Sequence, residues 1–268
     1  MKVENKVIVV TGAGNGLGRA IVHTLLSKGS KVIAIDIDEK GLEETVKQSG
    51  IHSDDLATYI LNITEREKVI KVTDDLINIF GRVDGLINNA GIIQPFMHVN
   101  EMGFEVINKI MEVNFFGTLY LTKALLPHFL KQEKAHIVNV SSLGGFMPFP
   151  GQTIYGASKA AVKLLTEGLY SELKDTHVNV TVIHPGAVRT NIIANSGVND
   201  DFVDSSDKSR ALDPNKAALM IIKAMEKNKY RATIGNDSKL LDIIYRISPK
   251  YATNLIVKKI KDLPINKH

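Results

Sequence analysis

The chain has 268 residues, of which 44% are hydrophobic, enough for one α/β domain with a full apolar core. It lacks cysteine, which excludes disulfides and thiolate metal ligands and agrees with a reducing compartment. The 33 basic and 29 acidic residues are mixed along most of the chain, so the net charge of +4 indicates a solvated surface and we expect no nucleic-acid partner. The eight histidines are scattered, and no metal site is expected.

No segment of the chain has the pattern of a signal peptide or a membrane span. The first residues carry charges, and there is no uninterrupted apolar run of about twenty residues. We therefore expect a soluble, cytoplasmic protein.

The first predicted elements are a strand over residues 6–10, a glycine-rich loop, and a helix that includes residues 20–26. The loop fits G-x-x-x-G-x-G, on Gly12, Gly16 and Gly18. It does not fit G-x-G-x-x-G, because Leu17 stands where that pattern needs glycine. Such glycines let the backbone approach a pyrophosphate at the start of a helix, although a loop of this kind can also be only a turn.

The second predicted strand, residues 31–36, ends in a carboxylate at Asp36. At that point of a βαβ unit, a carboxylate can accept hydrogen bonds from the adenosine ribose hydroxyls. The alternative is a cap on the next helix, for which Asp38 is better placed. Since Ile37 stands where a basic residue would bind a 2′-phosphate, we expect NAD to be preferred over NADP.

Later segments continue the alternation of strands and helices. Further strands are predicted near Ala57, Val83, Ile137, Val178 and Ala232, and helical patterns cover Glu65–Phe80, Met102–Leu130 and Pro214–Lys227. This alternation requires parallel crossovers. We predict an α/β fold with a single Rossmann-type doubly wound domain over residues 1–236, whose seven-stranded parallel sheet is flanked by helices.

Tyr155 and Lys159 are four residues apart, at the start of a run with helical spacing over Ala157–Leu173, so their side chains project from one face. A phenol titrates near pH 10, but an ammonium about 4 Å away favours the phenolate by up to roughly 4 kcal/mol at an effective dielectric near 20. Tyr155 would then be a working general acid/base. Alone, the pair is common by chance, and the alternative is an ordinary helix in which the two residues are unrelated.

With the glycine loop, Asp36, Ser142, Tyr155 and Lys159 in this order, the chain resembles the classical short-chain dehydrogenase/reductase family. Other family-like segments agree: Asn88–Gly91, Asn114 and His184–Thr190. The resemblance runs from about Val3 to Gly235.

The resemblance implies that Tyr155 is the acid/base, that Lys159 lowers its pKa and binds the nicotinamide ribose, and that Ser142 donates to the substrate oxygen. Asn114 would hold a water in a proton relay, and Ser141 would be structural. The implied dinucleotide site comprises Gly12, Asn15, Gly16, Leu17, Gly18, Asp36, Asn62, Ile63, Asn89, Ala90, Gly91, Tyr155, Lys159, Pro185, Gly186, Val188 and Thr190. Asn62 replaces the aspartate usual in the family, but its carbonyl can still accept from an adenine amine.

The resemblance also implies a homodimer or homotetramer in which the helices bearing Asn114 and Tyr155 pair across an axis. The residues expected to border the cleft are apolar and favour a hydrophobic secondary alcohol or ketone, with ordinary packing as the alternative: Ile92, Ile93, Phe96, Leu143, Phe146, Met147 and Phe149. His98 and His184 could face this cleft, but a structural role is preferred. Residues 191–210 are predicted to form a mobile lid, or else a disordered loop.

Two functions from different classes fit these residues. The first is an NAD(P)-dependent oxidoreductase, and the second is a catalytically silent NAD-binding sensor or scaffold. Because a silent protein has no reason to retain Asn114, Ser142, Tyr155 and Lys159 together, the enzyme is favoured.

Residues 237–268 are predicted to form a basic amphipathic extension. Its basic residues, Lys239, Arg246, Lys250, Lys258, Lys259, Lys261 and Lys267, outnumber Asp242 and Asp262. Leu240, Leu241, Ile244 and Ile247 are predicted to form one apolar stripe, and Leu255, Ile256 and Ile260 a shorter one. Such helices can lie on anionic membranes or cover protein surface, and the second is favoured here.

Overall fold

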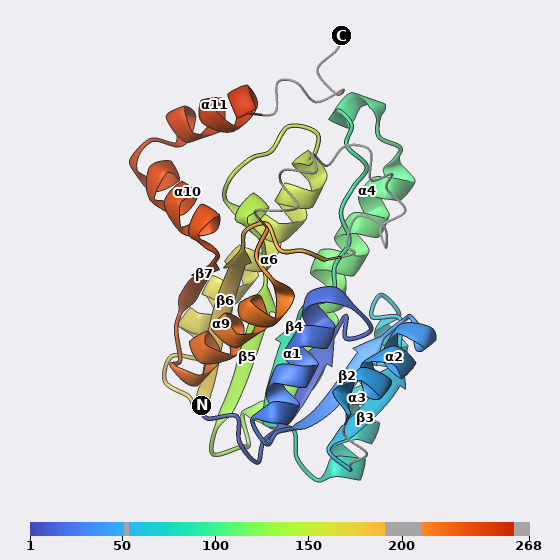
Figure 1. Ribbon diagram of the computed structural model, residues 1–268. Coiled ribbons are helices and arrows are strands. Elements are labelled where there is room, and N and C mark those ends of the chain that lie inside the picture. Colours follow the sequence, from blue (N-terminus) through green and yellow to red (C-terminus); the bar gives the residue numbers. More distant parts are fainter. Residues whose placement is uncertain (51–53, 191–210, 260–268) are drawn as a thin grey trace.

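The computed structural model describes residues 1–50, 54–190 and 211–259. Within them, seven strands form one parallel sheet with the order β3-β2-β1-β4-β5-β6-β7, and helices cover both faces (Figure 1). The predicted fold class is therefore confirmed. The predicted lid, residues 191–210, lies outside the described residues.

The strands are short and mostly aliphatic, and the central ones are buried along their whole length, as expected for a parallel sheet covered on both faces. They are β1 (Val7–Thr11), β2 (Lys31–Asp36), β3 (Leu56–Ile60), β4 (Gly85–Asn88), β5 (Ala135–Val140), β6 (Val178–Pro185) and β7 (Arg231–Ile234). The strand order reverses at β1, which pairs with both β2 and β4. In an open parallel sheet, ligands bind beyond the carboxyl ends of the strands at such a switch point.

The helices are α1 (Gly16–Ser27), α2 (Glu39–Ser49), α3 (Arg66–Phe80), α4 (Phe104–Met111), α5 (Gly117–Phe129), α6 (Thr153–Glu172), α9 (Pro214–Glu226), α10 (Asn236–Ile247) and α11 (Pro249–Lys259). Alternate residues of β1 divide the core between the two faces. Ile8 and Val10 belong to the cluster that includes α1 and α9, whereas Val7 and Val9 belong to the cluster that includes α3, α5 and α6.

Two predicted starts and one predicted continuous helix differ from the structure. β4 begins at Gly85 rather than Val83, and α6 begins at Thr153, one turn before the predicted start. The helix predicted over Met102–Leu130 is interrupted by a π-helical segment, η2 (Glu112–Phe116), between α4 and α5. Apolar spacing does not reveal a wider turn, because a π segment preserves the apolar character of the helix while adding a residue.

The two C-terminal helices of the described residues lie at one edge of the molecule, where α10 is next to β7 and α11 packs on α10 (Figure 1). Ala252 and Ile256 of α11 are buried in a small cluster with Leu143 and Met147, against which Leu241, Ile244 and Tyr245 of α10 pack. Only part of the predicted stripe on α10 is covered within this chain, because Leu240 and Ile247 are 59% and 79% exposed. The inward face of α10 is centred further round the helix and includes Tyr245. None of the described helices is long and apolar enough to cross a membrane.

Candidate active site

The glycine loop after β1 is held against the segment after β4. Gly12 and Gly16 have φ values of +67° and +49°, which favour glycine. A Cβ at Gly12 would lie 2.8 Å from Ala90 Cα, and one at Gly18 would collide with Gly12 O. The side chain of Asn89 donates to Thr11 O at 3.0 Å, so the predicted residues Asn89 and Ala90 lie directly beside the loop. This close backbone approach forms the kind of cradle that a pyrophosphate requires.

Asp36, at the end of β2, accepts hydrogen bonds from two backbone N–H groups. Gly14 N lies 2.7 Å from Oδ2 and Asp38 N lies 3.0 Å from Oδ1. A carboxylate offers about four acceptor positions, so the group can still accept from ribose hydroxyls. Asp38 occupies the N-cap position of α2 but makes no side-chain cap hydrogen bond.

Arg19, the arginine nearest to Asp36 in sequence, is bonded to the glycine loop and to α2. Arg19 donates to the carbonyl oxygens of Gly14 and Gly41, and its Nε lies 3.0 Å from Thr45 Oγ1. Ile37, the residue after Asp36, is 67% exposed. Within the described residues, Asp36 forms hydrogen bonds but no ion pair.

Asn62 and Ile63 make contacts that the sequence analysis did not anticipate. Asn62 Oδ1 accepts from both the N–H and the hydroxyl of Thr64, at 3.1 and 2.9 Å. Both lone pairs of that oxygen are therefore used, and the expected bond to an adenine amine would have to displace Thr64. Ile63 is buried where a Cβ on Gly117 would lie 2.5 Å from its Cδ1.

Ser142, Tyr155, Lys159 and Asn114 converge beyond the carboxyl ends of β4 and β5. Ser142 follows β5 and is hydrogen-bonded to Tyr155, which lies in the first turn of α6. Lys159 Nζ donates to Val140 O at 3.0 Å. A Cβ at Gly91 would lie 3.0 Å from Lys159 Nζ and 3.1 Å from Asn114 Oδ1, so Gly91 brings the segment after β4 close to both side chains.

In the protein alone, burial is the largest influence on the pKa values of Tyr155 and Lys159. It raises the pKa of Tyr155, while the hydrogen bond with Ser142 acts in the opposite direction. Burial also lowers the pKa of Lys159 to about 8. In the protein alone the Lys159 ammonium donates to Val140 O, and the expectation that Lys159 lowers the pKa of Tyr155 stays a prediction for the complex with the cofactor.

Asn114 lies in the π segment η2 and is completely buried. Its Oδ1 accepts from Ile92 N at 2.8 Å, and its Nδ2 donates to Ile92 O at 3.0 Å and to Ser158 Oγ at 2.9 Å. The side chain thus connects the segment after β4 to α6. Its expected role in a water relay stays a prediction.

The neighbouring Ser141 and His184 have structural contacts. Ser141 Oγ donates to Lys159 O at 2.7 Å, and His184 Nδ1 lies 3.0 Å from Ser142 O. The His184 ring is fully buried with its edge against Phe146, and burial lowers its pKa to about 4. These contacts agree with the structural roles expected for both residues.

The segment after β6 returns to the glycine loop. Gly186 N donates to Ile234 O at 2.8 Å, and Val188 forms a bridge with Leu212. A Cβ at Gly16 would lie 3.1 Å from Thr190 Cβ, so Thr190 borders the start of α1. The structure therefore brings together predicted residues from both ends of the expected cofactor.

Sequence reasoning missed three residues that hold the site. Asp237 Oδ2 accepts from Ala187 N at 2.9 Å, although Asp237 lies in the predicted extension. Ser158 bonds to Asn114, and the buried Gln94 contacts the first turn of α6. Of the three, only Ser158 could have been found from its sequence neighbours, since it lies between Tyr155 and Lys159. Asp237 and Gln94 contact residues that are far away in the sequence.

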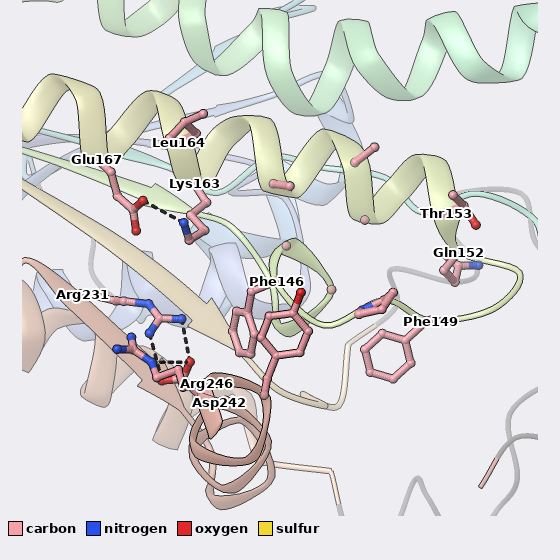
Figure 2. Close-up of a pocket in the computed structure, with 17 residues that line it drawn as sticks. Phe146, Phe149, Gln152, Thr153, Lys163, Leu164, Glu167, Arg231, Asp242 and Arg246 are labelled. Atoms are coloured by element: carbon pink, nitrogen blue, oxygen red, sulfur yellow. Dashed lines mark hydrogen bonds and ion pairs between the residues drawn. The ribbon is translucent and has the colours of Figure 1, made fainter. Parts of the chain in front are cut away.

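A separate cavity of about 680 Å³ lies on the neighbouring face of α6 (Figure 2). It is lined by Gly144, Gly145, Phe146, Pro148, Phe149, Gln152, Thr153, Gly156, Ala157, Ala160, Lys163, Leu164, Glu167, Arg231, Asp242, Tyr245 and Arg246. Its charged groups pair with one another: Lys163 with Glu167, and Arg231 and Arg246 with Asp242. The cavity contains none of the four candidate catalytic residues.

This arrangement corrects part of the expected substrate cleft. Leu143 and Met147 are buried against α11, and Phe146 and Phe149 line the separate cavity. For Leu143 and Met147 packing replaces the expected cleft role, whereas for Phe146 and Phe149 that role stays a prediction. Ile92, Ile93 and Phe96 remain partly exposed on the segment after β4.

Comparisons with known proteins agree with this geometry. A family model described as short chain dehydrogenase matches residues 6–201. SadH of Mycobacterium tuberculosis, whose name calls it an oxidoreductase, is 37% identical over 252 residues, covering 91% of each chain.

Two solved structures of short-chain dehydrogenases carry different cofactors. One from Burkholderia phymatum, in complex with NAD, has a TM-score of 0.83 at 27% identity and covers 94% of this chain and 96% of its own. One from Burkholderia cenocepacia, in complex with NADP, has a TM-score of 0.81 at 25% identity and covers 96% and 99%. With the glycine cradle and the Ser142, Tyr155 and Lys159 group in place, the chain belongs to the short-chain dehydrogenase/reductase family of NAD(P)-dependent oxidoreductases.

Proposed function

We propose that the protein interconverts a hydrophobic secondary alcohol and its ketone, with NAD as the preferred cofactor and Tyr155 as the acid/base. The observation that carries this proposal is the hydrogen-bonded Ser142 and Tyr155 pair, which lies beside the buried Lys159 beyond the carboxyl end of β5. The resemblance to the family supplies the roles, and the geometry supports them.

A bound nicotinamide dinucleotide supplies the hydride acceptor for alcohol oxidation and the hydride donor for ketone reduction. Gly12, Gly16 and Gly18 would hold its pyrophosphate by backbone N–H groups, with Asp36 at the adenosine ribose. Asn89 and Thr190, on opposite sides of the loop, would border the adenosine and the nicotinamide.

Tyr155 removes the hydroxyl proton as the alcohol is oxidised, and returns a proton to the ketone oxygen in the reverse direction. Ser142 donates a hydrogen bond to the same oxygen. Because burial raises the pKa of Tyr155, a positive charge directed at the phenol is needed to form the phenolate. Lys159 is the group placed to provide it, after its ammonium turns from Val140 O toward the ribose and the phenol.

The substrate is proposed to be apolar because Ile92, Ile93 and Phe96 follow the segment that Asn114 and Gly91 bring beside the catalytic group. Asp36 supports the choice of NAD, since its charge opposes a 2′-phosphate. We also propose a homo-oligomer, because Phe104, Phe116 and Leu164 expose apolar side chains on the packed helices α4, η2 and α6.

A panel of secondary alcohols, steroids, retinoids and long-chain ketones tests the proposal. We expect the absorbance of the reduced cofactor to change with at least one hydrophobic member of the panel. Cofactor binding without turnover on the whole panel would instead favour the catalytically silent sensor or scaffold.

A further inference from the structure

The helix that carries Tyr155 lacks a local N-terminal cap. Gln152 occupies the N-cap position of α6 but makes no side-chain cap hydrogen bond. The first N–H groups of a helix have no partner within it and need acceptors from elsewhere. One of these donors is the N–H of Tyr155 itself.

Gln94 supplies that acceptor from a distant part of the chain. Its Oε1 accepts from Tyr155 N at 2.9 Å across a separation of 61 residues. The other end of the same amide, Nε2, donates to Gly151 O at 2.7 Å. Gln94 is completely buried, so its amide spans the turn that enters α6 at two fixed points.

Gln152 completes a reciprocal contact with the same residue. Its Nε2 donates to Gln94 O at 2.9 Å. Figure 2 shows Gln152 next to Thr153, where the loop enters α6. Gly151, whose carbonyl accepts from Gln94, has a φ of +76°, so the turn depends on a glycine conformation as well as on these bonds.

The segment that bears Gln94 is also anchored at the candidate cofactor and catalytic sites. Asn89 and Ala90 donate to Thr11 Oγ1 at 3.0 and 3.1 Å, beside the glycine loop. Ile92 exchanges two hydrogen bonds with Asn114. Gln94 therefore connects the backbone of Tyr155 to the segment that borders the dinucleotide.

We propose that Gln94 is a positioning residue, which sets the place of the Tyr155 phenol relative to the cofactor and the substrate oxygen. The proposal rests on the acid/base role of Tyr155 proposed above. An acceptor and a donor at opposite ends of one rigid amide fix both the start of α6 and the turn before it. A small displacement of a catalytic group can cost about a hundredfold in rate, which is why such a fixed geometry matters.

Two substitutions separate positioning from simple packing. Gln94→Met keeps the approximate size and removes both hydrogen bonds. In Gln94→Glu, a neutral carboxyl group can still accept from Tyr155 N and donate to Gly151 O, whereas a carboxylate cannot donate and repels that carbonyl oxygen. Because burial raises the pKa of a carboxyl group, the neutral form persists at moderately low pH.

We expect Gln94→Met to lower kcat at least tenfold at every pH. The NADH dissociation constant should change by less than about threefold, because the residues that bind the cofactor keep their own contacts. Gln94→Glu should retain activity at low pH and lose it as pH rises, in addition to any trend of the wild type. The matched control is Thr166→Val on the same helix, which removes the 3.0 Å hydrogen bond from Asn139 Nδ2 and is expected to lower the melting temperature without changing kcat.

Amide hydrogen exchange gives a result that does not depend on turnover. The N–H groups at residues 153–156 should exchange faster in Gln94→Met than in Thr166→Val, even if no substrate is found. Unchanged exchange in Gln94→Met would overturn the positioning role independently of the proposed function. A wild-type kcat in Gln94→Met, on a substrate that the wild type turns over, would overturn it as well.

Discussion

In the proposed function, the preference for NAD is assigned to Asp36. Its carboxylate is held by Gly14 N and Asp38 N, and Arg19 is bonded to the backbone carbonyls of Gly14 and Gly41 and forms no ion pair with Asp36. The sequence was sufficient to place this carboxylate at the end of β2, because strand length and the glycine loop define that point. It could not show that Arg19 is engaged with Gly41 and Thr45, because those contacts depend on how α1 and α2 pack.

We predict that the protein binds NADH about ten- to a hundredfold more tightly than NADPH, because a 2′-phosphate near Asp36 adds a net repulsion of ~1–3 kcal/mol after screening. Equilibrium fluorescence titration of both reduced cofactors measures the preference. Asp36→Asn should reduce this preference, whereas Asp38→Asn, two residues further along the chain, should leave it nearly unchanged. Equal affinity of the wild type for both cofactors, or tighter NADPH, would contradict the role given to Asp36.

The elements around the site show what a sequence pattern can and cannot define. The Tyr155 and Lys159 spacing identified α6, but its first turn was missed, since the acceptor for Tyr155 N comes from Gln94 rather than from a local cap. The π segment was missed for a related reason. Its Asn114 is stabilised by Ile92 and Ser158, neither of which lies in the same helix.

The extension was predicted to be amphipathic, and the structure shows which side chains are buried. Leu241 and Ile244 pack inward with α11 over Leu143 and Met147, while Leu240 and Ile247 point outward. Asp237 attaches the beginning of α10 to the segment after β6 through Ala187 N, and Ser238 attaches it to β6 itself through His184 O. The extension therefore covers its own subunit on one side.

Removing residues 239–268 should lower the melting temperature or change the oligomer, because Leu143 and Met147 lose their cover. A smaller change tests the same contact: Ile256→Ala is expected to destabilise by about 2 kcal/mol, and the exposed Val257→Ala by less than about 0.5 kcal/mol. Urea unfolding measures both values. Salt-sensitive binding of the intact protein to anionic liposomes, lost on deletion, would favour a membrane role instead.

At the scale of the whole molecule, the doubly wound sheet could be predicted because each strand and helix has its own periodicity and crossovers follow fixed rules. The ionisation of buried groups could not, because it depends on burial that only the complete fold creates. His136 and His184 are both fully buried, and burial lowers their pKa values to about 3 and about 4.

These two histidines should make the fold sensitive to mild acid. Between pH 6.5 and 5 the unfolded chain binds protons at both residues, whereas the folded protein does not. The free energy of unfolding therefore falls as the pH falls, by up to about 1.4 kcal/mol per pH unit for each histidine. Urea unfolding across this range measures the slope. His136→Gln should reduce the slope, whereas His177→Gln, at an exposed position, should leave it unchanged; a wild-type slope near zero would contradict the prediction.

The central claim is that this molecule transfers a hydride between nicotinamide and a carbonyl carbon with Tyr155 as the acid/base. NADH carrying deuterium at the transferred C4 position tests it on a panel of hydrophobic ketones. We predict one deuterium at the carbinol carbon of the alcohol formed by the wild type. Tyr155→Phe should form it at least a hundredfold more slowly while binding NADH nearly as well, since general acid/base catalysis typically contributes ~10²–10⁴ in rate. Label transfer by Tyr155→Phe at more than about a tenth of the wild-type rate would contradict the assignment of the acid/base. Absence of label transfer to every ketone of the panel, by a wild-type protein that binds NADH, would contradict the proposed reaction.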